Sequence, residues 1–407
     1  MADLFDILKA KYATPADEHN GESAEKNAQR LAKLKFVSAE GEKLETTTKN
    51  APALAAMLPS LDTAVLAKTQ LSSWKEAFGP VEVFPRLSTL DLSYNPLPLP
   101  LVPTPSATLT VLSLNGCGLS WKDLCAVAAA FPQLQELYAY ENKISAVDSQ
   151  DVVFPSLKKL SLEGNGLRSW TSVQNILHAA PKLEVLYASN NELGSESDDE
   201  KSTPIKFDSS KLALKELSVS NNRIGSWEQV SRIAQWFSPS LKALRISGNP
   251  VLDGLSPARQ RIAVLARVSG LELLNGSVIR PIELREAAKI ASGEASSSAA
   301  ATAAGAKAGS ARPGFPTVAL QCNVAAASKG LSSEEKRLPL SMRVADVVVL
   351  CRKLFGVPAS TEVALFYVEP PSPASMGSFP QPMDNEGLTL EGYGIAEGSK
   401  IIVELKN

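Results

Sequence analysis

Side chains that commonly carry out catalysis are sparse in this sequence. Its 407 residues include two histidines, His19 and His178, and no G-x-S-x-G, G-x-x-x-x-G-K or H-E-x-x-H segment. His178 falls in an expected helix, where a place at the edge of the core is more ordinary than a role as general base. We therefore expect no catalytic residue and no enzymatic activity.

The four cysteines do not form a metal or redox motif. None of Cys117, Cys125, Cys322 and Cys351 stands in C-x-x-C spacing with another, as zinc and dithiol sites require. We interpret them as small buried groups in a reducing compartment. We accordingly expect no metal site and no cofactor.

The charge balance limits the classes of partner. Lys and Arg number 41 against 43 Asp and Glu, so the chain lacks the broad basic field that nonspecific nucleic-acid binding needs. No run of about 18 uncharged apolar residues occurs. We expect a cytoplasmic protein that binds neither nucleic acid nor membrane.

A repeat of about 25 residues organises residues 34–251. The pattern L-x-x-L-x-L-x-x-N-x-L is matched without exception from Leu87 to Leu97 and from Leu157 to Leu167. It recurs with small substitutions in units that begin at Leu109, Leu134, Leu183, Leu214 and Leu241, and more weakly at Leu34 and Leu61. This spacing is typical of leucine-rich repeats, whose short L-x-L strands stack into a parallel sheet because no repeat can bury its own apolar face. The asparagines are expected to satisfy backbone groups, with Cys117 or Thr69 standing in for two of them.

The segments that return between strands carry helix signals. Four of them open with a serine followed by a tryptophan: Ser73-Trp74, Ser120-Trp121, Ser169-Trp170 and Ser226-Trp227. Serine is a preferred N-cap, and Glu76, Asp123, Ser172 and Gln229 stand three residues beyond. We expect helices on the outside of the sheet, with the recurrent tryptophans in the core and not in a cofactor site.

Two interruptions and a closing unit follow from the spacing. The proline-rich stretch after Asn95 and the acidic insertion Glu196 to Glu200 are expected to be surface loops, and the insertion is either simply solvated or a contact tuned by phosphorylation. Residues 255–290 are expected to shield the open end of the repeats with a helix, a strand-like segment and a second helix.

The C-terminal region predicts a second domain. After an Ala/Ser/Gly-rich linker, the order strand, strand, helix, strand, strand is typical of a ubiquitin-like β-grasp domain, and the chain lacks a terminal Gly-Gly. The predicted fold class is α/β: a leucine-rich repeat solenoid with outer helices plus this domain. The predicted parts are a flexible amphipathic segment 1–30, the repeat domain with its cap 31–290, the linker 291–315 and the ubiquitin-like domain 316–407.

Taken together, these features resemble one family. Repeats with serine-tryptophan helix starts, a cap that reads Asn249-Pro250 through Leu273-Leu274-Asn275 to Arg285, and a C-terminal ubiquitin-like domain are similar to tubulin-specific chaperone E (tubulin-binding cofactor E) and its E-like relatives. Leu4 to Tyr12 resembles the segment after that family's CAP-Gly domain, which grips the acidic tail of α-tubulin and has no counterpart here. The resemblance implies a cytoplasmic, cytoskeleton-associated protein that acts with other tubulin-folding cofactors on α-tubulin, in assembly or dissociation of the heterodimer and hence in microtubule organisation. The alternative is an adaptor that couples a protein client to ubiquitin receptors or the proteasome.

The candidate binding residues lie beside the strand leucines, on the expected concave face. Tyrosine and glutamate gather there across adjacent repeats, either as a hot spot or as ordinary exposed strand residues. The candidates are Tyr94, Glu136, Tyr138, Tyr140, Glu141, Glu163, Tyr187 and Arg245. On the hot-spot hypothesis, replacing Tyr138 and Tyr187 with alanine should weaken α-tubulin capture without changing the melting temperature.

Overall fold

The chain forms two compact units, Met1–Leu271 and Glu272–Asn407. The computed structural model describes residues 3–13, 24–98, 106–147, 154–195, 212–292, 317–322, 333–339, 342–358, 361–368, 381–383, 389–390, 393, 395 and 399–406. The acidic insertion, residues 99–105 of the proline-rich stretch and the linker from residue 293 onward lie outside them. The division after Leu271 precedes the boundary expected at residue 290, and the sequence-based domain limits stay predictions.

Short parallel strands build the first unit, one for each predicted repeat. In the described part of the chain they are β1 (Phe36–Ser38), β2 (Thr63–Val65), β3 (Thr89–Asp91), β4 (Val111–Ser113), β5 (Glu136–Tyr138), β6 (Lys159–Ser161), β7 (Val185–Tyr187), β8 (Glu216–Ser218) and β9 (Ala243–Arg245). Their central residues stand in register, for example Leu137 with Leu160 and Leu186, and are buried. The leucine-rich repeat prediction is therefore confirmed.

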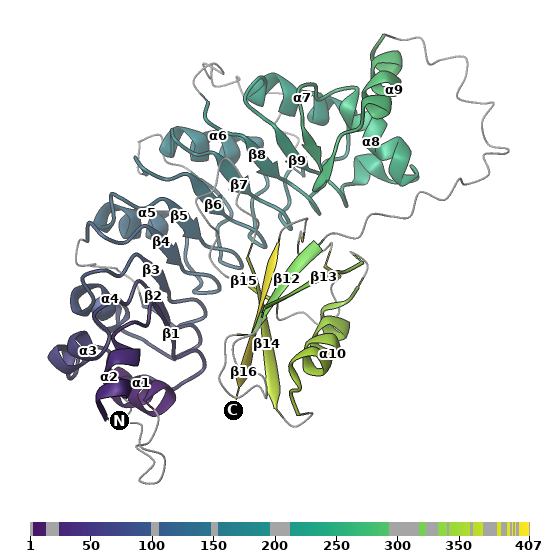
Figure 1. Cartoon of the computed structure of the whole chain (residues 1–407). Coiled ribbons are helices and arrows are strands. Elements are labelled where there is room, and N and C mark those ends of the chain that lie inside the picture. The colour runs from purple at the N-terminus through teal and green to yellow at the C-terminus, as the bar shows by residue number, and fades with distance from the viewer. Residues whose placement is uncertain are drawn as a thin grey trace. The chain divides into compact units, whose positions relative to one another are not determined.

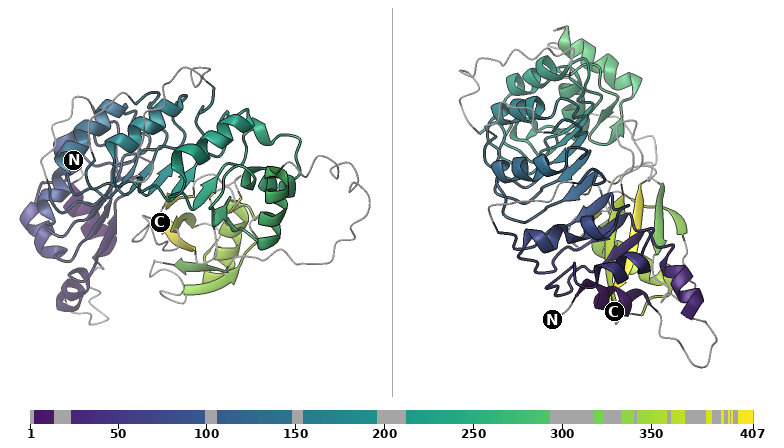
Figure 2. Two further views of the ribbon diagram at one scale, coloured as in Figure 1. Left: turned by 90° about the horizontal axis from the view of Figure 1, so that it is seen from above. Right: turned by 90° about the vertical axis from the view of Figure 1, so that its left-hand side faces the viewer.

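Within the described residues, the helices of the repeats lie on one face of this sheet and none of them lies on the other (Figures 1 and 2). They are α3 (Ala51–Met57), α4 (Trp74–Val83), α5 (Trp121–Ala130), α6 (Trp170–Ala179) and α7 (Trp227–Phe237). The predicted helix starts are confirmed, because α4 to α7 all begin directly after the serine. The tryptophans that begin α4, α5 and α6 are buried, whereas Trp227 is half-buried beneath the Arg267 guanidinium, which lies 4.2 Å from the ring centroid.

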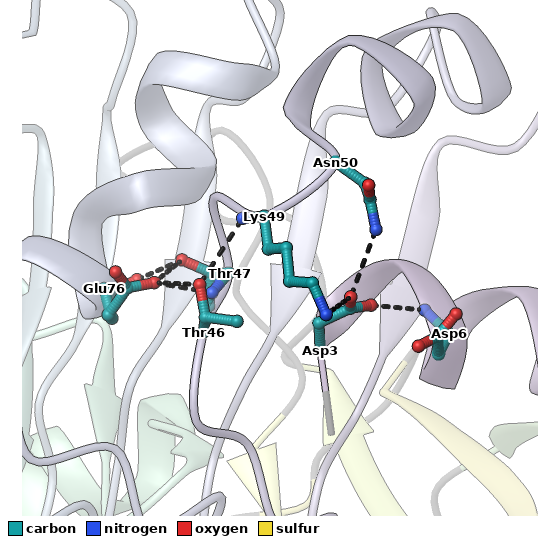
Figure 3. Close-up of polar contacts among 7 residues, drawn as sticks. All are labelled: Asp3, Asp6, Thr46, Thr47, Lys49, Asn50 and Glu76. Atoms are coloured by element: carbon teal, nitrogen blue, oxygen red, sulfur yellow. Dashed lines mark hydrogen bonds and ion pairs between the residues drawn. The ribbon is translucent and has the colours of Figure 1, made fainter. Parts of the chain in front are cut away.

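The expected capping boxes are only partly correct. Ser226 accepts a hydrogen bond from the backbone N–H of Gln229 (3.3 Å), and Asp123 accepts one from the N–H of Ser120 (2.8 Å). Ser73, in contrast, makes no side-chain cap. Glu76 bonds instead to the preceding repeat, accepting from Thr46 Oγ1 (2.9 Å) and the Thr47 N–H (2.7 Å) (Figure 3). Glu76 therefore bonds to Thr46 and Thr47 of the preceding repeat, and not to the start of its own helix as predicted.

The repeat asparagines connect neighbouring repeats through their side-chain amides. Asn222 is typical: its Nδ2 donates to the carbonyls of Ala188 (2.9 Å) and Val219 (3.0 Å), and its Oδ1 accepts from the Leu193 N–H (2.9 Å). Where the asparagine is replaced, Thr69 Oγ1 donates to Leu66 O (2.8 Å) and Cys117 Sγ to Leu92 O (3.5 Å). The predicted structural role of these positions is confirmed.

The sequence predicts a flexible segment at residues 1–30, but the described part of this segment packs on the repeats. Helix α1 (Leu4–Tyr12) buries Leu4 and Leu8, and α2 (Ala24–Leu31) follows. Asp3 caps α1 by accepting from the Asp6 N–H (2.8 Å) and also contacts Lys49 Nζ (3.3 Å) and Asn50 Nδ2 (3.1 Å) (Figure 3). Burial alone would raise the pKa of Asp3, but these bonds outweigh it and hold the pKa below its ordinary value.

The elements expected in the closing unit are present. They are the 3₁₀ turn η3 (Pro250–Leu252), α8 (Pro257–Leu265), the antiparallel pair β10 (Leu273–Leu274) and β11 (Ser277–Val278), and α9 (Pro281–Ala291). Glu283 caps α9 by accepting from the Arg280 N–H (2.8 Å).

The second unit contains the predicted β-grasp. Its elements are β12 (Thr317–Cys322), β13 (Ser333–Arg337), α10 (Val344–Phe355), β14 (Glu362–Val368), β15 (Gln381–Pro382) and β16 (Lys400–Lys406). The described strands follow the order β13-β12-β16-β14-β15, with β12 and β16 parallel at the centre. Val347 and Cys351 of α10 pack into a core with Val318, Leu365 and Val403. Gly356 ends α10 in the left-handed conformation, as expected from its position.

Candidate partner-binding site

The helix-free face of the repeat sheet displays two columns of side chains. Alternate strand residues point to opposite faces, so the residues on either side of each central leucine point away from the helices. The first column runs through Glu136, Lys159, Val185 and Glu216, and the second through Ser113, Tyr138, Ser161, Tyr187, Ser218 and Arg245. Four candidates, Glu136, Tyr138, Tyr187 and Arg245, therefore share one face.

These side chains contact one another across β5 to β9. Tyr138 Oη donates to Glu136 Oε2 (2.7 Å), and Lys159 Nζ lies 5.3 Å from the Tyr138 ring centroid and 5.1 Å from that of Tyr187. Tyr187 Oη donates to Glu216 Oε1 (3.5 Å), the same oxygen that lies 3.6 Å from Arg245 Nε. We call these six residues, Glu136, Tyr138, Lys159, Tyr187, Glu216 and Arg245, the strand network. Two cations balance two carboxylates within it.

Burial changes the interpretation of the two tyrosines. Tyr138 is 2% exposed and Tyr187 is 8% exposed, and Lys159 beside them is also buried. The two tyrosines are therefore not ordinary exposed strand residues. Truncating a buried ring leaves a cavity, so we now expect the double alanine variant to lower the melting temperature. The earlier expectation of an unchanged melting temperature does not fit this structure.

A second group of candidates lies in the loops that follow the strands. Tyr94 Oη donates to Glu141 Oε2 (2.8 Å), and the Tyr94 and Tyr140 rings meet edge to face at 6.2 Å. The Glu141 N–H donates to the Glu163 carbonyl (2.9 Å), and Lys68 Nζ lies 5.4 Å from the Tyr94 centroid. We call these five residues, Lys68, Tyr94, Tyr140, Glu141 and Glu163, the rim cluster. Lys68 and Glu141 are exposed, and the other three are half-buried.

Sequence reasoning missed three members of these groups. Lys159 and Glu216 occupy strand positions beside leucines, so the repeat register could have included them among the candidates. Lys68 precedes Thr69 as Tyr94 precedes Asn95, so the repeat register could have marked it as well. Its place beside Tyr94 depends on how consecutive repeats stack.

Cys117, Cys125 and His178 stand outside the strand network and the rim cluster. Burial raises the pKa of both Cys117 and Cys125 to about 11, so these thiols are protonated and weakly nucleophilic at neutral pH. His178 is exposed on α6, and not at the core edge as expected. Within the described ranges, no three His, Cys, Asp or Glu side chains gather as a metal site would require, and no helix is long and apolar enough to cross a membrane.

The sequence relatives of this chain carry names from one group of tubulin chaperones. No protein-family model matches the chain. It is 29% identical over 390 residues to "Tubulin-folding cofactor E" of Arabidopsis thaliana, covering 86% of this chain and 70% of that protein. It is 26% identical to the human "Tubulin-specific chaperone cofactor E-like protein", covering 88% and 84% respectively. The solution structure of the ubiquitin-like domain of mouse tubulin-specific chaperone E aligns with 25% of this chain and 96% of that domain, at 27% identity and a TM-score of 0.20. Over most of its length, this chain is thus homologous to proteins named tubulin-folding cofactor E and cofactor E-like.

Proposed function

We propose that this protein is a tubulin chaperone that binds α-tubulin on the helix-free face of its repeat unit. In this role it acts with other tubulin-folding cofactors in the cytoplasm, in association with the cytoskeleton, and contributes to microtubule organisation. The observation that carries the proposal is the homology to proteins named for tubulin folding over 86% and 88% of the chain. The sheet face supports it, because tyrosines and charged groups contact one another along its central strands.

The proposed mechanism is noncatalytic. A protein that binds one conformation of tubulin more tightly shifts the tubulin population toward that conformation. Such a shift is sufficient to favour assembly or dissociation of the heterodimer. The ubiquitin-like unit, linked in the same chain, engages a second site on the client or on another cofactor. Tethering makes that second contact intramolecular and raises its effective concentration.

The direct test uses the full chain and purified tubulin dimers. Dimers carrying a donor fluorophore on one subunit and an acceptor on the other would lose energy transfer on dissociation. We expect the full chain to co-elute with tubulin on size-exclusion chromatography and to change the rate of subunit separation, alone or with the partner cofactors. Absence of a complex together with an unchanged rate would refute the proposal.

The β-grasp unit favours one second candidate, an adaptor for ubiquitin receptors or the proteasome. Its sheet order and packed α10 are those of a β-grasp scaffold, and this candidate rests on that analogy of fold. A pull-down with the full chain separates the two functions. Recovery of tubulin and its cofactors supports the chaperone, whereas recovery of proteasome subunits without tubulin supports the adaptor.

A further inference from the structure

A β-turn in the loop after β7 ends in an exposed serine, Ser195. The Ser195 N–H donates to the Glu192 carbonyl (3.1 Å), and a bond of this kind keeps the first and last Cα atoms of a turn within about 7 Å of each other. Gly194, the third residue of the turn, has a φ of 91°, as a type II turn requires. The side chains of Ser195 and Glu192 therefore start from neighbouring points on the surface.

Glu192 lies between arginines of the two adjacent repeats. Its Oε2 is 3.3 Å from Arg168 Nε and 3.9 Å from Arg223 Nε, and these two arginine side chains are 57% and 62% exposed. Arg168 follows β6 and Arg223 follows β8, so the repeat of β7 lies between them. The turn also contacts the backbone of both residues. The Gly194 N–H donates to the Arg168 carbonyl (3.1 Å), and a Cβ built on Gly194 would lie 2.9 Å from the Arg223 carbonyl oxygen. Two exposed cations thus share one carboxylate beside Ser195.

The sequence after Ser195 is acidic. Glu196 follows directly, Asp198 stands three positions beyond the serine, and Asp199 and Glu200 come next. Kinases with a basic substrate groove select serines in such sequences, because complementary charges determine which segment binds. Residues 196–200 lie outside the described part of the chain, and only their chemical identity matters for this selection.

We propose that Ser195 is a phosphorylation site for a serine/threonine kinase that selects acidic residues after the serine, and that Arg168 and Arg223 bind the phosphate. In the transfer, Ser195 Oγ attacks the γ-phosphorus of ATP. The new O–P bond forms as the bond to the departing ADP breaks, and the hydroxyl proton passes to a carboxylate base of the kinase. A phosphoserine carries about two negative charges and three acceptor oxygens, against the single charge of Glu192, so it is the stronger partner for two guanidinium groups.

The bound phosphate joins three consecutive repeats. Ser195 belongs to the repeat of β7, and the two arginines belong to the repeats of β6 and β8. This site goes beyond the proposed function and does not depend on which client the protein binds.

The first experiment maps the modification. The full chain would be treated with ATP and a kinase of this class, and the products would be mapped by tandem mass spectrometry. Ser197→Ala is the matched control for Ser195→Ala, because it removes the neighbouring serine of the same acidic sequence. We expect phosphate at Ser195 in the wild type and in Ser197→Ala. No phosphate at Ser195, or phosphate at Ser197 alone, overturns the proposal.

The second experiment measures the contact with the arginines. In the phosphorylated Ser197→Ala chain, phosphorus-31 NMR would follow the titration of the phosphate, whose signal is identified by its loss when Ser195→Ala is added. Nearby cations stabilise the dianion, so the pKa of the phosphate should lie below that of the same phosphate in a synthetic peptide of residues 190–200, by roughly 0.5–1. Arg168→Gln with Arg223→Gln should abolish most of this difference.

The matched control for the arginine variant is Arg86→Gln with Arg259→Gln, which removes two exposed arginines outside this group. The melting temperatures of the unphosphorylated chains check folding. We expect the control to keep the lowered pKa of the phosphate. If the phosphate titrates alike in the parent chain, the Arg168/Arg223 variant and the peptide, the proposed contact is wrong. Neither experiment includes tubulin, so failure of the proposed function would leave this site unaffected.

Discussion

Replacing Asn222 with alanine tests how the repeats are held together. The side chain is buried, and its amide joins its own repeat, through Val219, to the preceding repeat, through Ala188 and Leu193. The two carbonyls do not lose every partner, because Asn191 Nδ2 also donates to Ala188 O (3.2 Å) and Asn249 Nδ2 to Val219 O (2.9 Å). The Leu193 N–H donates to Asn222 Oδ1, and alanine offers it no acceptor.

The magnitude follows from these partners. One buried N–H left without an acceptor costs about 1–3 kcal/mol, and two weakened carbonyl contacts add roughly 1 kcal/mol together. We therefore expect Asn222→Ala to lower the free energy of unfolding by about 3 kcal/mol. For a unit of this size, that corresponds to a fall of roughly 6–12 °C in melting temperature.

The assay is urea unfolding followed by circular dichroism and by tryptophan fluorescence. Asn221→Gly is the matched control, because Asn221 has φ 54° and its exposed side chain bonds only to Asn190 among the contacts described. We expect the control to lie within about 0.5 kcal/mol of the wild type. If Asn222→Ala were as stable as the control, the inter-repeat amides would not be the stabilising element we describe.

Three further predictions concern the rest of the fold. Burial raises the pKa of Asp91 to about 6, above its ordinary value of 3.8, so the folded state binds this proton more tightly than the unfolded state does. As pH rises from about 4 to 6 and above, the carboxylate ionises in its buried position and the folded state loses stability. Asp91→Asn should therefore be more stable than the wild type near pH 7.5, by up to about 3 kcal/mol, and calorimetry should show the gain disappearing toward about pH 4. Asp3→Ala removes a carboxylate whose pKa is lowered in the fold, so the variant should be less stable than the wild type by roughly 1–3 kcal/mol at neutral pH. This difference in stability should shrink as pH falls through the acid range. A difference that stays the same at low pH would contradict the hydrogen bonds assigned to Asp3. Leu8→Ala leaves a cavity where α1 packs on the repeats, so denaturant titration should show a free energy of unfolding lower by about 2–5 kcal/mol. Lys9 is exposed, and Lys9→Ala should leave the free energy of unfolding almost unchanged.

Local periodicity was sufficient to predict the repeat fold. A strand of three residues is too short to be recognised alone, but the recurrence of Leu-x-Leu with an asparagine three positions later requires stacking in register, because only neighbouring repeats can bury those leucines and satisfy those amides. The serine-tryptophan helix starts and the β-grasp order were also predicted, since capping and alternation are properties of adjacent residues. The resemblance to the tubulin chaperone family came from the order of these same elements.

Tertiary structure alone decided which candidate residues act together. Sequence treated Tyr94, Glu136, Tyr138 and Glu141 as one exposed patch, whereas stacking separates a buried strand network around Tyr138 from a cluster in the loops around Tyr94 and Glu141. It also turned Glu76 from a local cap into a bond between repeats. Burial, side-chain pairing and charge balance depend on distances between residues some 25 positions apart, and the identity of a residue does not specify those distances.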